Sequence, residues 1–262
     1  MSFSSVFKKA ASLFADTLYP ENLACAACGR ELREAGEFSL CPGCRETLEF
    51  HDDFCAKSEE HTFTQSRAAC VYAGSARDMV VALKNGNAWV AKTLALIMAG
   101  RFPYKNPSDN NNPAANEDSN KNYDNENPPD KANITFDYCM AVPIDKKRLA
   151  ERGFNQSILI AKELCRLLNN NSTLHTPNST LYIDGLAKIK HTEKQSLLSG
   201  AERAANVKGA YGLSPACPDL SGKTVLLIDD VFTTGATVSE CSSAILKGGA
   251  AAVYIYAFAT GR

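Results

Sequence analysis

Two adjacent aspartates, Asp229 and Asp230, follow a short apolar run and precede a segment rich in threonine, in the stretch LLIDDVFTTGAT. Carboxylate oxygens accept hydrogen bonds from hydroxyl groups but repel a phosphate, so the pair suits a sugar diol. The following segment opens a predicted helix, where free backbone N–H groups form a phosphate site. Gly235 allows the backbone to turn or to approach a ligand closely. The stretch therefore predicts a site for a sugar phosphate.

Other phosphate-binding patterns fit this chain less well. Residues 222–224 read GKT, as in a phosphate loop, but Cys217 stands where the leading glycine belongs, and the tripeptide precedes a strand instead of following one. The absence of G-x-G-x-x-G excludes a dinucleotide-binding fingerprint. The simplest alternative is a strand followed by a polar turn, with Asp230 only capping the next helix.

Positive charge gathers upstream, in the stretch VPIDKKRLAERGFNQS. A diphosphate needs concentrated positive charge, and guanidinium groups bind phosphate oxygens in pairs. Lys146, Arg148 and Arg152 are therefore candidate ligands for a diphosphate, with Arg152 expected nearest to it. The alternative is a solvated basic turn.

Two C-x-x-C pairs, Cys25 with Cys28 and Cys41 with Cys44, lie near the start of the chain. Each pair can present two thiolates to one ion, and two pairs complete a tetrahedral site. Four protein ligands leave no open position, so we expect a structural zinc ion (Zn2+). A redox role would need a reactive C-x-x-C at a helix start, which paired knuckles do not suggest. A second site is disfavoured by spacing; its ligands would come from His51, Cys55, His61 and Cys70.

Apolar patterning predicts the fold that positions these groups. Strand-like runs alternate with helical patterns in the second half of the chain, which predicts an α/β fold: a parallel sheet with helices on both faces. Ligands bind at the carboxyl ends of strands in such sheets, which is where the aspartates fall. The expected strands are residues 136–144, 224–229 and 251–259; the expected helices are residues 155–168 and 236–249, with two more between residues 75 and 102.

Composition divides the chain into zones. Residues 1–20 predict an amphipathic helix that packs on the protein, with docking to a partner or membrane as the alternative. Residues 21–70 form a zinc-ribbon-like region, and residues 71–262 form the α/β domain. Residues 103–133 are rich in Asn, Asp and Pro and predict a disordered insertion. Residues 169–180 predict a similar polar loop.

Charge and hydropathy narrow the function classes. The 262 residues carry a net charge of −1, which argues against a wholesale nucleic-acid or membrane binder, although a local basic patch remains open. No apolar run reaches the length of a membrane span. Nothing in the sequence suggests export, so we expect a cytoplasmic protein.

The stretch VLLIDDVFTTGAT resembles the ribose-phosphate signature of type I phosphoribosyltransferases, which bind 5-phosphoribosyl 1-diphosphate. The resemblance implies a type I phosphoribosyltransferase-like sheet flanked by helices. It also implies that Asp229 and Asp230 are the catalytic residues and contact the ribose 2- and 3-hydroxyls, and that Mg2+ bridges diphosphate and ribose oxygens. The residues implied to wrap the 5-phosphate are Phe232, Thr233, Thr234, Gly235, Ala236 and Thr237.

Three segments in order resemble the ComF family: P-x-x-x-K-R-x-x-x-R-G-F-N-Q, Q-S-x-L-S-x-x-x-R-x-x-N-V-x-G-A and the DDVFTTGAT box. Members are described as amidophosphoribosyltransferase-like or competence proteins, and they usually begin with a cysteine ribbon. The resemblance implies a loop, within residues 191–211, that closes over the substrate. It implies phosphoribosyl transfer, but no segment identifies the acceptor. The competing interpretation is a non-catalytic DNA-uptake factor that binds single-stranded DNA through residues 146–152 and works with a helicase-like partner.

Overall fold

The computed structural model describes residues 23–33, 37–51, 62–102, 134–170, 180–190 and 207–261. Three predicted features lie wholly outside these ranges or have most of their length there. They are the N-terminal helix over residues 1–20, the insertion over residues 103–133 and the substrate-closing loop within residues 191–211.

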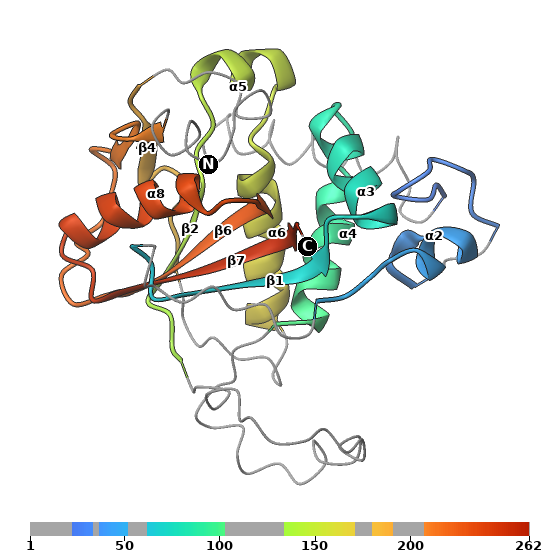
Figure 1. The fold of residues 1–262 in the computed structure, drawn as a ribbon, viewed down its shortest axis with the longest axis horizontal. Helices are drawn as coiled ribbons and strands as arrows, with labels where there is room; N and C mark the ends of the chain where they lie inside the picture. Colours follow the sequence, from blue (N-terminus) through green and yellow to red (C-terminus); the bar gives the residue numbers. More distant parts are fainter. Residues whose placement is uncertain are drawn as a thin grey trace, which may run out of the picture.

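A parallel sheet forms the centre of the described structure (Figure 1), which confirms the predicted α/β fold. Its strands lie in the order β1-β7-β6-β2-β3, and every neighbouring pair is parallel. The last two strands along the chain, β6 and β7, occupy the middle of the sheet. The strands are β1 (Gln65–Val71), β2 (Tyr138–Ala141), β3 (Thr180–Leu181), β6 (Thr224–Phe232) and β7 (Ala252–Thr260).

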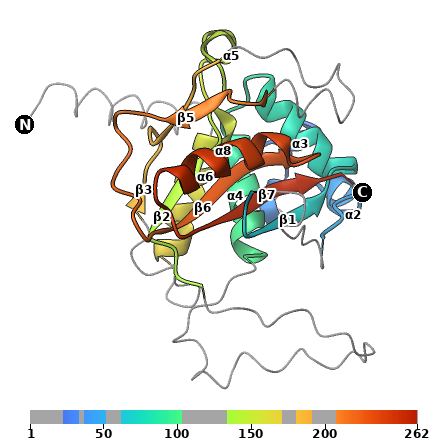
Figure 2. The same cartoon turned by 60° about the vertical axis from the view of Figure 1, so that its left-hand side comes forward.

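Helices cover both faces of this sheet. Figure 2 shows α8 in front of the strands and α4 and α6 behind them. Each layer has its own apolar core, because the buried residues of α8 pack with one face of the sheet and those of α4 and α6 pack with the other. The helices of this domain are α3 (Gly74–Lys84), α4 (Val90–Gly100), α5 (Lys146–Arg152), α6 (Gln156–Asn170) and α8 (Ala236–Lys247).

The alternation of side chains in the central strands supplies both cores. In β6, Leu226 and Ile228 belong to the core under α4 and α6, whereas Val225 and Leu227 belong to the core under α8. Successive residues of a strand point to opposite faces, so a continuous apolar run is what a strand buried on both faces requires.

Two expected boundaries differ from the structure. Strand β6 does not end at Asp229 but continues to Phe232, because β7 is long enough to pair with it as far as Thr260. Asp229 and Asp230 therefore lie within the last residues of β6 and not beyond its end. Strand β1 begins at Gln65, before residue 71 where the α/β domain was expected to begin, and it pairs with β7.

The cysteine-rich region and a small hairpin flank the sheet. The region contains the 3-10 helix η1 (Glu37–Ser39) and the short helix α2 (Pro42–Glu46), and lies beside α3 in Figure 1. Ser75 Oγ at the start of α3 donates to the carbonyl of Cys44 at 2.5 Å, which ties α3 to the second knuckle. The hairpin pairs β4 (Leu186–Lys188) with β5 (Tyr211–Leu213) in antiparallel fashion.

Candidate ligand cavity and metal centre

A cavity of about 560 Å³ opens at the carboxyl end of the sheet, between β6, α5, the start of α6 and the β4–β5 hairpin. Its volume falls in the range of small-molecule sites. Most of the predicted ligand residues line it: Asp229, Asp230, Phe232, Thr233, Gly235, Ala236, Thr237, Arg148 and Arg152. Thr234 and Lys146 are exposed and are not among the lining residues.

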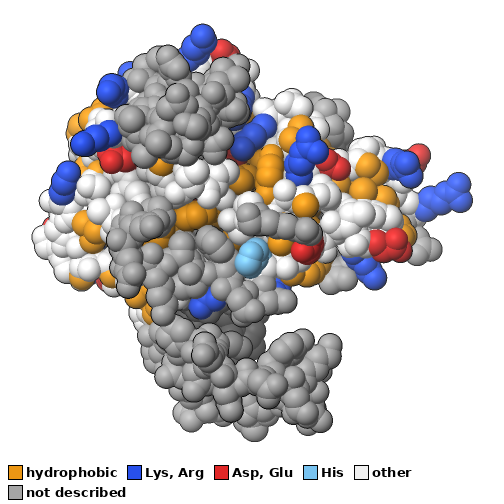
Figure 3. Space-filling view, viewed as in Figure 1, with side chains coloured by type: hydrophobic (Ala, Val, Ile, Leu, Met, Phe, Trp, Pro, Cys, Tyr) orange, Lys and Arg blue, Asp and Glu red, His pale blue; other side chains and the backbone are white. Residues whose placement is uncertain are grey.

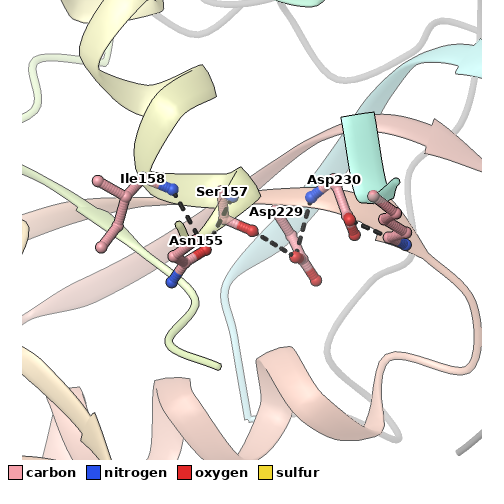
Figure 4. Close-up of polar contacts among 6 residues, drawn as sticks. Asn155, Ser157, Ile158, Asp229 and Asp230 are labelled. Atoms are coloured by element: carbon pink, nitrogen blue, oxygen red, sulfur yellow. Dashed lines mark hydrogen bonds and ion pairs between the residues drawn. The ribbon is translucent and has the colours of Figure 1, made fainter. Parts of the chain in front are cut away.

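The two aspartates have different surroundings (Figure 4). Asp229 is buried, and its Oδ1 accepts hydrogen bonds from Ser157 Oγ at 3.0 Å and from the backbone N–H of Asp230 at 2.9 Å. Asp230 is more accessible, and its Oδ2 lies 2.9 Å from Lys84 Nζ at the end of α3. One carboxylate is thus held by neutral donors and the other by a cation.

Burial sets the protonation of Asp229. Desolvation, reinforced by the neighbouring charge of Asp230, raises the pKa of Asp229 to about 7, although Lys84 and the hydrogen bonds from Ser157 and the Asp230 amide act in the opposite direction. Near neutral pH the Asp229 carboxyl is therefore divided between its ionised and protonated forms, and the protonated form can donate as well as accept a hydrogen bond.

The first turn of α6 holds Asp229 in place through Ser157. Asn155 caps this helix, because its Oδ1 accepts from the backbone N–H of Ser157 at 2.9 Å (Figure 4), and its Nδ2 donates to the carbonyl of Val142 at 2.9 Å. These contacts join α6 to the end of β2 on one side and to β6 on the other. Asn155 and Ser157 thus connect α6 to both neighbouring strands at the cavity wall.

The segment after β6 leads into α8 through Gly235. Gly235 precedes α8 with φ 75° and ψ −6°, a left-handed conformation that favours glycine. Thr233 is exposed, while Phe232 is buried and packs edge-on against Phe63 with ring centroids 6.0 Å apart. The Phe232 ring therefore anchors the loop in the core, so what this residue can offer a ligand is chiefly its backbone.

The basic segment after β2 is a helix and not an irregular turn. Asp145 caps α5 by accepting a hydrogen bond from the backbone N–H of Arg148 at 2.9 Å. Arg148 and Arg152 are one helical turn apart and both line the cavity, whereas Lys146 is exposed. The helical period thus divides the basic residues between the cavity and the outer surface.

Two lysines that sequence reasoning missed also line the cavity. Lys84 comes from α3 and pairs with Asp230, and Lys188 comes from β4. Lys188 Nζ lies 3.7 Å from Asp145 Oδ2 and 5.6 Å from the centroid of the Tyr211 ring. Desolvation lowers the pKa of Lys188, against the opposing attraction of Asp145. Neither lysine belongs to a motif, so no spacing in the sequence could have found it.

The four predicted cysteines form one cluster. Cys25, Cys28, Cys41 and Cys44 place their sulfur atoms within 4.8 Å of one another, and Cys28 Sγ lies 3.8 Å from Cys41 Sγ. A tetrahedron with metal–sulfur bonds of about 2.3 Å has sulfur–sulfur edges of about 3.8 Å. The cluster therefore has the dimensions of a tetrahedral four-thiolate metal site.

The protonation of the cluster favours a cation. Burial acts to raise the pKa of Cys25, but hydrogen bonds from the backbone N–H groups of Cys28, Cys41 and Ala27 outweigh it and lower that pKa to about 7. Burial and the neighbouring thiols raise the pKa of Cys44 to about 12. Without a positive ion the four sulfurs cannot all ionise near neutral pH, whereas a bound divalent ion makes ionisation favourable.

No further group of three or more potential metal ligands occurs within the described ranges. Cys70, weighed as a ligand of a second site, is buried in β1, and burial raises its pKa to about 12. Cys55 and His61, from the same predicted set, lie outside the described residues.

In the part of the chain that the structure describes, no helix is both long enough and apolar enough to cross a membrane.

Fold and site together define an α/β protein with a cavity at the carboxyl edge of a parallel sheet and a four-cysteine cluster that could hold a metal ion. The chain is 33% identical over 120 residues to the DNA utilization protein YhgH of Escherichia coli K12, a region that covers 46% of this chain and 48% of the relative. It is 32% identical over 118 residues to competence protein F of Haemophilus influenzae, with 45% and 48% covered.

A relative from Bacillus subtilis shows the same degree of similarity. Competence protein ComFC of Bacillus subtilis is 34% identical over 111 residues, with 42% of this chain and 39% of the relative covered. The aligned regions span about half the length of the first two relatives. No protein-family model matches the chain. The similarities support assignment of this chain to the ComF family, as its motifs predicted.

Proposed function

We propose that the cavity binds 5-phosphoribosyl 1-diphosphate together with Mg2+ and presents its ribose to an acceptor nucleophile. The observation that supports this most directly is the convergence of three chemistries in one cavity: the carboxylates of Asp229 and Asp230, the loop from Thr233 to Thr237, and the guanidinium groups of Arg148 and Arg152. They suit a diol, a phosphate and a diphosphate, in that order.

The oxygen donors of the site suit a hard cation. Mg2+ prefers oxygen ligands and keeps several waters, so it would enter with the diphosphate and offset part of the negative charge beside Asp229 and Asp230. Lys84, Arg148 and Arg152 add positive charge from the protein itself. Together with Mg2+, these groups would offset part of the ligand's negative charge.

In the proposed transfer, the bond between the anomeric carbon and the diphosphate oxygen breaks while a bond to the nucleophile forms, and the diphosphate leaves with the bonding electron pair. Positive charge develops on the ribose in the transition state. Asp230, which pairs with Lys84, and Asp229 would stabilise that charge. Arg148 and Arg152 would stabilise the negative charge on the leaving group.

Titration calorimetry tests the binding step. Wild-type protein with Mg2+ is expected to release or absorb heat on addition of 5-phosphoribosyl 1-diphosphate, and an Asp229→Asn/Asp230→Asn variant is expected to lose binding by a factor of about 100 or more, because two hydrogen-bond acceptors for the diol lose their charge. Asp219→Asn, a change at an exposed aspartate of a surface turn, is the matched control. Absence of heat from the wild type would refute the proposal.

We further propose that the cysteine cluster holds a structural zinc ion. The observation behind it is the 3.8 Å edge between Cys28 Sγ and Cys41 Sγ, within a set of four sulfurs that leaves no position for a substrate. Metal analysis of purified protein is expected to give about one equivalent of zinc. A protein without zinc, or with iron in its place, would refute the identity of the metal.

A second candidate function is binding of single-stranded DNA, supported by the names of the relatives, which refer to competence and DNA utilization. Lys146, Arg148 and Arg152 of α5 would contact the phosphates. On the face drawn in Figure 3, however, Lys and Arg side chains lie in separate spots and not in a continuous stripe. Binding of a fluorescent single-stranded oligonucleotide at low salt tests it, and displacement by 5-phosphoribosyl 1-diphosphate would show that the two share the cavity.

A further inference from the structure

The side chain of Gln156 stands out among the residues that line the cavity. It is 2% exposed, and its Oε1 is a buried acceptor with no hydrogen-bond partner among the described residues. Leaving such a group unpaired costs about 1–3 kcal/mol. Most buried polar atoms in folded proteins find a partner, so an orphan at the wall of a cavity calls for an explanation.

Its neighbours in the first turn of α6 are fully engaged. Asn155 caps the helix and bonds the end of β2, and Ser157 donates to Asp229 Oδ1 at 3.0 Å. These bonds fix the backbone on both sides of Gln156. Gln156 is thus the residue next to Ser157, which holds Asp229. Rotation about the last side-chain bond of Gln156 costs little energy, so its amide can adjust to a ligand.

From this arrangement we infer that Gln156 is a specificity residue that hydrogen-bonds a ribose hydroxyl of the ligand, beside the two aspartates. The inference rests on the proposed sugar-phosphate ligand. An unpaired acceptor needs a donor, and ionised phosphate oxygens only accept, so the diphosphate and 5-phosphate cannot satisfy Oε1. The hydroxyls of the ribose are the donors that such a ligand offers.

The inference also gives the aspartates and Gln156 different tasks. Asp230 Oδ2 is engaged by Lys84, and Asp229 Oδ1 already accepts two hydrogen bonds. The two remaining carboxylate oxygens can accept from both hydroxyls of a diol, but an ionised carboxylate offers no donor to the oxygen of a hydroxyl. The Gln156 amide can accept from a ribose hydroxyl through Oε1 and can donate to a hydroxyl oxygen through Nε2.

A thermodynamic cycle between protein and ligand tests this inference. The protein variants are wild type and Gln156→Met, which keeps the length and volume of the side chain but removes both polar atoms. The ligands are ribose 5-phosphate, 2-deoxyribose 5-phosphate and 3-deoxyribose 5-phosphate, each titrated by calorimetry. Gln156→Met is expected to lower the affinity for ribose 5-phosphate about three- to tenfold. It is expected to leave the affinity for one of the two deoxy sugars nearly unchanged.

Equal loss for all three sugars, or no loss for any, would overturn the inference, because a purely structural or water-binding amide does not distinguish hydroxyls. Ser66→Ala is the matched control, since Ser66 Oγ is also buried without a partner among the described residues but does not line the cavity. Thermal unfolding of both variants checks that they fold. If the wild type binds none of the three sugars and no 5-phosphoribosyl 1-diphosphate, the proposed function itself fails, and the inference fails with it.

Discussion

Lys84 Nζ lies 2.9 Å from Asp230 Oδ2, and this ion pair joins the end of α3 to the end of β6 across the cavity wall. The two residues are far apart in the sequence, and each would be a solvated charge on its own. The pair is partly shielded, with side chains 31% and 13% exposed, so it orients the carboxylate more firmly than a surface pair would.

Removal of the Lys84 charge should weaken ligand binding. We expect Lys84→Met to lower the affinity for 5-phosphoribosyl 1-diphosphate about tenfold, because Asp230 loses the partner that orients it and the cavity loses a positive charge. Lys84→Arg, which keeps the charge, should retain most of the affinity. Calorimetry measures both. An unchanged affinity in Lys84→Met would show that the ion pair is incidental to the site.

Stability should depend on pH through Asp229. Its folded-state pKa is raised from 3.8 to about 7, so the folded protein holds this proton more tightly than the unfolded chain does. The stabilisation that this proton provides is complete below about pH 4 and is lost as pH rises to about 7. Asp229→Asn removes the dependence. We expect the variant to gain stability relative to wild type by on the order of 1–3 kcal/mol between pH 5.5 and 8.

Urea unfolding at several pH values measures this difference, and the Asp137→Asn variant provides the control. A backbone hydrogen bond from Thr224, with Lys223, lowers the pKa of Asp137. Asp137 is therefore ionised in both states throughout this pH range, and the effect of its substitution should not vary with pH. A constant difference between Asp229→Asn and wild type from pH 5.5 to 8 would contradict the prediction.

The helical period of α5 separates Arg152 from Lys146. Arg152 lines the cavity and Lys146 does not. Arg152→Ala should therefore lower the affinity for 5-phosphoribosyl 1-diphosphate about tenfold or more, whereas Lys146→Ala should change it by less than twofold. If α5 instead serves as a DNA-binding helix, both substitutions should weaken a single-stranded oligonucleotide to similar extents and reduce its salt dependence. The pair of variants thus separates the two candidate functions.

Loss of the proposed zinc ion should destabilise the α/β domain as well as the cysteine-rich region, here called the ribbon. Cys25, Leu40 and Leu48 of the ribbon belong to the same core as Met79 and Leu94 of the helices α3 and α4. Cys28→Ser should therefore release the metal and lower the thermal midpoint of the whole domain, by several degrees if the loss is about 1–2 kcal/mol. Cys217→Ser, a change at a cysteine outside the cluster, should do neither. A ribbon that unfolds alone, with the domain's midpoint unchanged, would show that the two are uncoupled.

The sequence by itself indicated the α/β fold, because a continuous apolar run such as Val225 to Ile228, set among helical patterns, is typical of a strand buried on both faces. It determined the cysteine cluster as well, since two C-x-x-C pairs can converge on one ion from local geometry. The paired aspartates and the Thr/Gly loop were equally visible, because they form one continuous stretch of the sequence.

Only the tertiary structure decided which other residues share the cavity. Lys84 and Lys188 reach it from α3 and from a hairpin that no pattern predicted, and the helical turn of α5 excludes Lys146. The extension of β6 to Phe232 depends on the length of β7, which pairs with it from a later part of the chain. The raised pKa of Asp229 and the orphan oxygen of Gln156 arise from burial. Burial is a property of the packed molecule, because it depends on residues that are distant in sequence.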